Sequence, residues 1–223
     1  MQNLIFPLAA LFACAFSFFL FLRDSEKESN GGEAVQTPAQ PDWPTLVYSA
    51  VMMVLTLALS IMLPRLFPES SMMSVLKRVL LISVIWPVAY IDFKTYRIPN
   101  AFLVLGLGVR TVVLAAELLF RDDTLIYTLI SEGIAAGALF IAAMLCSVCF
   151  KGSIGFGDIK LFVVLGLFLG MEGCWSAVFS ALVISLIVAL FLLATKKKSR
   201  KDAIPFGPAI VLGTYLSVCL TGM

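Results

Sequence analysis

The sequence predicts an all-α, polytopic integral membrane protein with about eight transmembrane helices. Of its 223 residues, 61% are apolar and 13% are charged, and the mean hydropathy is +1.01. Soluble domains are roughly 45–50% apolar and about 25% charged. The apolar residues here fall in uninterrupted runs of about twenty, the length that crosses a hydrocarbon layer of about 30 Å. This pattern excludes a soluble enzyme, a disordered tail and a disulfide scaffold.

The expected spans follow from these apolar runs. The first run, Leu4–Leu22, has no Lys or Arg before it. It is also longer than the apolar part of a typical signal peptide, so we expect a retained span. The others are Thr45–Leu63, Val79–Ile91, Ala101–Phe120, Leu125–Phe150, Asp158–Met171, Cys174–Ala194 and Phe206–Leu220. The third, sixth and eighth spans are short.

Three regions are expected along the chain. Residues 1–22 form a first transmembrane span, residues 23–44 a polar cytoplasmic linker, and residues 45–223 a membrane core. The linker is rich in Gly, Pro, Ser and charged residues. It has too few apolar residues to build a hydrophobic core, so we expect it to be mobile.

Lys and Arg in the short loops predict the orientation. The basic cluster at residues 196–201 should be cytoplasmic, because positive charge is enriched on that side. Counting back through the spans places residues 92–100 and 151–157 on the same side, and the N-terminus outside. Arg65, Lys77 and Arg78 disagree with this orientation, since they would then lie in a loop facing outward.

Several kinds of chemistry are excluded by composition. The chain has no histidine, so it has no Ser-His-Asp triad and no His-ligated metal. The net charge is +2, which does not indicate a nucleic-acid-binding surface. Cys146 and Cys149 form a C-x-x-C, but a structural zinc site needs four ligands and no second pair exists. We expect the cysteines to pack between helices, and no metal or organic cofactor is implied.

Two aspartates are the candidate functional residues. Asp92 closes the third span and Asp158 opens the sixth, so the predicted topology places both at one cytoplasmic edge of the bilayer. Ionisable groups at membrane depth are costly and are functional candidates by default. Either residue alone is readily explained as a helix cap or a boundary residue. Two such residues at one edge make that explanation much weaker.

A close pair of carboxylates has a recognisable chemistry. Because both cannot ionise cheaply, the pair shares one proton. The ionised member can deprotonate a water that attacks a peptide carbonyl, and the protonated member can supply the leaving amine with a proton. Gly155 and Gly157 precede the second aspartate, and the lack of a Cβ lets backbone approach closely there.

The motifs around these aspartates resemble a known family. The chain reads D-x-x-x-x-x-I-P-N from Asp92 to Asn100, which includes Pro99. It then reads G-x-G-D-x-K-L from Gly155 to Leu161, which includes Lys160, and Pro-Phe-Gly-Pro at residues 205–208. Order and spacing resemble the type IV prepilin peptidases, which are membrane aspartic proteases of the G-x-G-D type. The resemblance covers roughly residues 79–220.

The resemblance implies a function. In that family the two motif aspartates are catalytic, which corresponds to Asp92 and Asp158. The implied enzyme is an aspartic endopeptidase at the cytoplasmic face of the bacterial inner membrane. It removes short leaders from prepilins or pseudopilins, cutting after a glycine just before the substrate's hydrophobic helix. The implied partners are such a precursor and the lipid bilayer, with no nucleic acid.

The sequence also departs from the longer members of that family. Those members carry two C-x-x-C pairs in a cytoplasmic domain between the first two spans, a domain associated with N-methylation. Here residues 23–44 contain no cysteine, so we do not expect methyltransferase activity. The short form is similar to the peptidases of tight-adherence pili and to the archaeal preflagellin peptidases.

Two alternative functions remain open on sequence. A small transporter or channel subunit would use the aspartates to bind an ion, but it would place polar groups near the bilayer midplane and leaves the Gly motifs unexplained. The presenilin and signal-peptide-peptidase group shares G-x-G-D. That group pairs it with a Tyr-Asp element and a P-A-L element, whereas Tyr90 here is two residues from Asp92.

The other charged residues in the spans are predicted to be structural. Arg110 and Glu132 lie at similar depth in neighbouring spans, which predicts an ion pair, with Glu117 as a competing partner. Lys94, Arg97 and Lys160 lie at the membrane edge and are expected to be interfacial anchors. Asn100 is expected to cap the fourth span.

Overall fold

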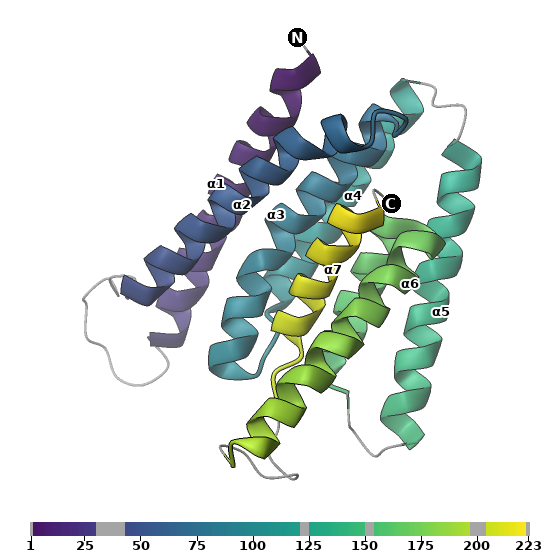
Figure 1. The fold of residues 1–223 in the computed structure, drawn as a ribbon. Helices are drawn as coiled ribbons and strands as arrows, with labels where there is room; N and C mark the ends of the chain where they lie inside the picture. Colours follow the sequence, from purple (N-terminus) through teal and green to yellow (C-terminus); the bar gives the residue numbers. More distant parts are fainter. Residues whose placement is uncertain (1, 30–42, 121–124, 150–153, 197–203, 222–223) are drawn as a thin grey trace.

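A computed structural model of the chain describes residues 2–29, 43–120, 125–149, 154–196 and 204–221. Within these ranges the secondary structure is seven α-helices with no strand (Figure 1). The helices are α1 (Gln2–Ser29), α2 (Trp43–Leu66), α3 (Met72–Thr95), α4 (Asn100–Leu119), α5 (Leu125–Cys149), α6 (Phe156–Ala194) and α7 (Gly207–Thr221). The predicted all-helical fold is confirmed.

The predicted number of about eight spans is not confirmed. Five helices, α2 to α6, are long and apolar enough to cross a membrane. Among the remaining described residues, the apolar stretch of α1 (Ile5–Phe21) and helix α7 are shorter. Both fall below the roughly 20 residues that a hydrocarbon core requires.

Helix α3 lies at the centre of the bundle. It packs against α1, α2, α4, α6 and α7, and α5 packs on the far side of α6 (Figure 1). In its most apolar stretch 67% of the residues are buried, against 33% or less in the other four long helices. Large apolar side chains such as Phe12, Val112 and Phe179 are exposed on the outer helices. Because lipid is as apolar as the core, such outward-facing residues are typical of a membrane bundle.

Helix α6 is interrupted at Gly170, whose φ of 64° and ψ of −170° are not helical. This conformation is accessible essentially to glycine alone. Gly173 and Ala181 contact successive turns of α7, which shows that the second half of α6 runs back toward the end where the first half begins. The interruption falls at the boundary expected between the sixth and seventh spans. The first half, residues 156–169, is about 21 Å long and therefore short for a span.

Small residues allow α6 to approach its neighbours closely. A Cβ on Gly166 would lie 2.6 Å from the backbone of Ala136 in α5. A Cβ on Gly213 in α7 would lie 2.5 Å from the backbone nitrogen of Ala181. Such close contacts stabilise the packing of helices in lipid, where no hydrophobic effect drives the helices together. They fix both halves of α6, and so its first turn.

Helix α3 starts seven residues before the predicted third span. Ser71 caps it by accepting a hydrogen bond from the Ser74 amide at 3.1 Å. The prediction began at Val79 because it treated Lys77 and Arg78 as loop charges. Lys77 is instead 5% exposed within the helix. The prediction also ended the first span at Leu22, whereas α1 continues to Ser29, through Glu, Lys and Arg residues that favour helix.

The expected linker lies mostly outside the described residues, since the structure describes none of residues 30–42. The basic cluster that predicted the orientation, residues 196–201, also lies outside the described residues except for Lys196. Of the three cations that disagreed with that orientation, Lys77 and Arg78 belong to α3 rather than to a loop. Only Arg65 of these three is exposed, at the end of α2.

Candidate active site

Asp92 lies in the last turn of α3 and is 6% exposed. The helix ends because Tyr96 adopts a left-handed conformation, with φ 54° and ψ 32°, and donates its N–H to the Asp92 carbonyl at 2.9 Å. An ending of this kind satisfies a free carbonyl of the last turn. It also holds the backbone of Asp92 in regular helix up to the point where the chain turns away.

The first turn of α7 faces the Asp92 carboxylate. The Gly207 amide donates a hydrogen bond to Oδ2 at 2.7 Å, and the Phe206 backbone also hydrogen-bonds this carboxylate. A Cβ on Gly207 would lie 2.8 Å from the same oxygen, so the approach requires glycine. Helix N-termini attract negative charge, because their first N–H groups lack partners within the helix. The Pro-Phe-Gly-Pro element therefore holds Asp92, a contact that sequence reasoning missed.

Asp158 lies in the first turn of α6 and is half-buried. Gly155 is the residue that caps this helix, and its backbone hydrogen-bonds the Asp158 carboxylate. An acidic side chain that reaches back from the third helical position to the capping residue is a capping-box arrangement. Asp158 is therefore not the N-cap residue itself, although its carboxylate contributes to the cap of α6.

The two carboxylates lie near one another. Asp92 is close enough to Asp158 to repel it electrostatically. Asp92 comes from the C-terminal end of α3, Asp158 from the start of α6, and the start of α7 closes the site. Two helix N-termini therefore point toward one pair of acids. A nearby pair of carboxyl groups is the combination that general acid–base hydrolysis uses.

Gly157 and the loop after α3 keep the first turn of α6 in place. A Cβ on Gly157 would lie 2.9 Å from Cβ of Ile98, so the helix packs directly on this loop. Pro99 follows as the N-cap residue of α4, half-buried and extended at φ −66°. Asp92 and Asp158 are thus joined through the packing of the Ile-Pro-Asn segment against the Gly-x-Gly-Asp segment.

Lys160 lies at the edge of this site. Its side chain is exposed, and Nζ donates to Oδ1 of Asn100 at 2.9 Å. The prediction that Asn100 caps α4 is wrong: Pro99 is the N-cap, and no side-chain hydrogen bond caps the helix. The Asn100 side chain instead ties the start of α4 to α6. Arg97 is exposed, and Nζ of Lys94 lies 4.9 Å from the centre of the Tyr90 ring.

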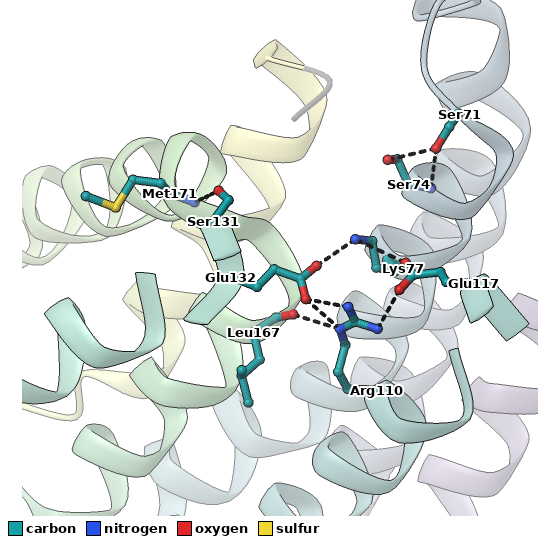
Figure 2. A network of polar contacts seen from close by, with 9 residues as sticks. All are labelled: Ser71, Ser74, Lys77, Arg110, Glu117, Ser131, Glu132, Leu167 and Met171. Atoms are coloured by element: carbon teal, nitrogen blue, oxygen red, sulfur yellow. Dashed lines mark hydrogen bonds and ion pairs between the residues drawn. The ribbon is translucent and has the colours of Figure 1, made fainter. Parts of the chain in front are cut away.

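A buried ion network joins α3, α4 and α5 (Figure 2). Arg110 of α4 and Glu132 of α5 form the predicted ion pair, with Nε at 2.9 Å from Oε2. Nη1 of Arg110 also contacts Oε2 of Glu117 at 3.1 Å, so both predicted partners are used. Lys77 of α3 completes the network at 2.6 Å from Glu132 and 3.4 Å from Glu117. Sequence reasoning missed Lys77 because it placed that residue in a loop.

Within the described residues the five cysteines form no disulfide. Cys14 and Cys174 are buried as expected, and Cys219 is half-buried. Cys146 and Cys149 are exposed on the outer face of α5, so the expectation that they pack between helices is wrong for this pair. Among the described residues, no group of three Cys, Asp or Glu side chains is placed to hold a metal ion.

Comparison with known proteins identifies a family for the chain. Residues 79–193 match the model of the type IV leader peptidase family, and this segment contains both aspartates. The chain belongs to the type IV leader peptidase family. With its apolar helices, family membership makes it a multi-pass membrane protein. It does not favour the small transporter or channel subunit that was the alternative function.

One relative of this chain comes from Bacillus subtilis (strain 168). It is a prepilin leader peptidase/N-methyltransferase, and the two chains are 33% identical over 139 residues. The aligned region covers 62% of this chain and 53% of the relative, so the chain spans about half the length of the relative it matches. No solved structure matches the chain.

Proposed function

We propose that this protein is a membrane aspartic endopeptidase that removes leader peptides from prepilin-like precursors. The observation that carries the proposal is the meeting of Asp92 and Asp158 beside the start of α7, within the segment that the family model matches. The proposal is for the peptidase reaction alone, since residues 23–44 contain no cysteine.

The two carboxylates take different roles in this proposal. Asp92 accepts backbone hydrogen bonds from Gly207 and Phe206, whereas Asp158 accepts one from Gly155. Hydrogen bonds from N–H groups favour a charged acceptor. We therefore assign Asp92 as the ionised base and Asp158 as the protonated acid.

The reaction then follows the usual course of acid–base hydrolysis. Asp92 takes a proton from water, and the water oxygen bonds to the scissile carbonyl carbon. Asp158 hydrogen-bonds the carbonyl oxygen in the tetrahedral intermediate. The C–N bond breaks as Asp158 gives its proton to the leaving nitrogen, which yields a leader with a new carboxylate and a mature chain with a new amino terminus.

The position of the site suits a substrate that is itself a membrane helix. Both aspartates lie at helix ends, where the bundle meets the membrane surface, rather than in the middle of a span. A polar leader can reach this depth from the aqueous side while the following apolar helix stays in lipid. We propose that this side is cytoplasmic and that the membrane is the bacterial inner membrane.

Co-expression with a prepilin tests the proposal. The precursor is expressed with the wild-type chain, with Asp92→Asn or with Asp158→Asn, and leader removal is followed by the mobility and mass of the product. We expect either variant to abolish processing. Glu69→Gln is the matched control, because Glu69 is an exposed acid between α2 and α3. Full processing by Asp92→Asn or by Asp158→Asn would refute the two-aspartate mechanism.

A further inference from the structure

A second polar site lies at the end of the bundle opposite the aspartates. A cavity of about 190 Å³ opens between the N-terminal turns of α3 and α5 and the interruption of α6 at Gly170. Arg78, at its wall, precedes Asp92 by 14 residues of the same helix. At 1.5 Å per residue, this separates the two sites by about 21 Å along α3.

One of the cations around the cavity has no ion-pair partner among the described residues. Lys77 and Arg110 are neutralised by Glu117 and Glu132, to which they are joined by the contacts of Figure 2. Arg78 adds a positive charge on the turn that carries Lys77, and no ion pair to it is found in the described part of the chain. Glu172, an exposed acid that also lines the cavity, forms no ion pair with Arg78 there, so Arg78 remains an unpaired cation.

One nitrogen of the Arg78 guanidinium also lacks a hydrogen-bond partner. This nitrogen, Nη1, is buried, and among the described residues no acceptor reaches it. Leaving a buried charged donor unsatisfied costs at least about 1–3 kcal/mol. An anion in the cavity would remove this cost. A guanidinium matches phosphate especially well, because its parallel N–H groups can bond two phosphate oxygens.

Hydroxyl groups complete the lining. Ser131 accepts a hydrogen bond from the Met171 amide at 3.0 Å and still carries a proton to donate into the cavity (Figure 2). Tyr127 and Thr128 line the same wall. Glu132 also lines it but is already paired, and Glu172 is exposed. One water needs only about 10–15 Å³ of such space, so a phosphate group fits with room for solvent.

We propose that this cavity binds a phosphate group, either the phosphodiester of a phospholipid headgroup or free phosphate. Arg78 bonds the phosphate oxygens, and Ser131 donates a hydrogen bond to them. The site joins α3, α5 and the two halves of α6, so its occupation stabilises the folded bundle. It uses none of the residues proposed for proteolysis, and it stands whether or not the proposed peptidase function is correct.

Thermal unfolding of the full chain in detergent tests this site, with the fluorescence of Trp86 and Trp175 as the readout. The probes are inorganic phosphate, short-chain phosphatidylglycerol and short-chain diacylglycerol, compared at constant ionic strength. At a probe concentration of about ten times its dissociation constant, the unfolding constant should fall about eleven-fold. We expect phosphatidylglycerol to stabilise the protein and diacylglycerol, which has no phosphate, to leave it unchanged.

Arg78→Ala should reduce the response to the phosphate-bearing probe from about eleven-fold to about two-fold or less, because the removed hydrogen bonds correspond to at least about a tenfold loss of affinity. Arg78→Gln keeps more of the side chain and serves if the alanine variant does not fold. Arg65→Ala removes an exposed cation from the end of α2 and should keep the full response. Asp92→Asn should keep it too.

The outcomes separate the two sources of phosphate. Stabilisation by phosphatidylglycerol alone assigns a lipid headgroup, and equal stabilisation by inorganic phosphate assigns the phosphate group itself. The proposal is overturned if no phosphate-bearing probe stabilises the protein. It is equally overturned if diacylglycerol matches phosphatidylglycerol, or if Arg78→Ala and Arg78→Gln respond like the wild type.

Discussion

Replacing Gly207 with alanine tests whether the start of α7 positions Asp92. The Gly207 nitrogen lies 2.7 Å from Oδ2 of Asp92. A Cβ at residue 207 would lie 2.8 Å from that oxygen and 2.9 Å from Cβ of Asp92. Both separations are shorter than van der Waals contact. Because Asp92 is 6% exposed and has little room, either its side chain or the first turn of α7 must move.

The size of the effect follows from two terms. A hydrogen bond to a charged group contributes about 1.5–3 kcal/mol to stability, and Gly207→Ala should remove most of one. Overpacking adds a cost of about 1–3 kcal/mol, part of which relaxes as the helix shifts. Misplacing a catalytic group by about 1 Å can lower the rate about 100-fold. We expect leader cleavage to fall by up to that factor.

The assay compares cleavage time courses and thermal unfolding for three glycine variants. Gly137→Ala is the neutral control, because a Cβ there meets nothing within 4 Å. Gly166→Ala is the control for lost packing, since its Cβ would lie 2.6 Å from the Ala136 backbone, away from the aspartates. Below its unfolding temperature, Gly166→Ala should cleave faster than Gly207→Ala. If Gly207→Ala cleaves as fast as Gly137→Ala, the start of α7 does not position Asp92.

Three further predictions test other contacts. Gly157→Ala places a Cβ 2.9 Å from Ile98 and should slow leader cleavage. Adding Ile98→Ala should restore part of the cleavage rate, and no restoration would show that this contact is not the cause. Arg110→Ala leaves Glu132 with Lys77 as its remaining cation and should lower the unfolding free energy by about 3–5 kcal/mol, measured by chemical denaturation. A decrease as small as that caused by substituting an exposed residue would contradict this prediction. Lys160→Ala removes an exposed contact to Asn100, so thermal unfolding should report a loss of no more than about 1 kcal/mol.

The sequence predicted most of the helical architecture because lipid imposes a simple rule. A run of apolar residues must satisfy its own backbone hydrogen bonds, so it becomes a helix. This holds for α4 and α5, whose bounds differ from the predicted ones by one residue at most at either end. It fails for α3, where Lys77 interrupts the apolar run in sequence but is neutralised by Glu117 and Glu132 in space. A hydropathy profile along the sequence contains no information about an ion-pair partner on another helix.

The candidate site also has features that the sequence could predict and features that it could not. Asp92 and Asp158 could be singled out because both are acids at span ends within spaced motifs. The contact of Gly207 with Asp92 could not, since it joins residues 115 positions apart through the packing of α7 on α3. The interruption of α6 lies close to the predicted division between the sixth and seventh spans, but the direction in which the helix continues depends on its contacts with α7.

The most direct test of the two-aspartate mechanism compares single and double variants. Purified Asp92→Asn, Asp158→Asn and the double variant are assayed on one prepilin, with the cleaved leader quantified by mass spectrometry. Because the two carboxylates are proposed to act as a unit, each single variant should lose as much activity as the double variant. If one single variant retains substantial cleavage that the double variant loses, the carboxylates act independently and the proposed mechanism is wrong.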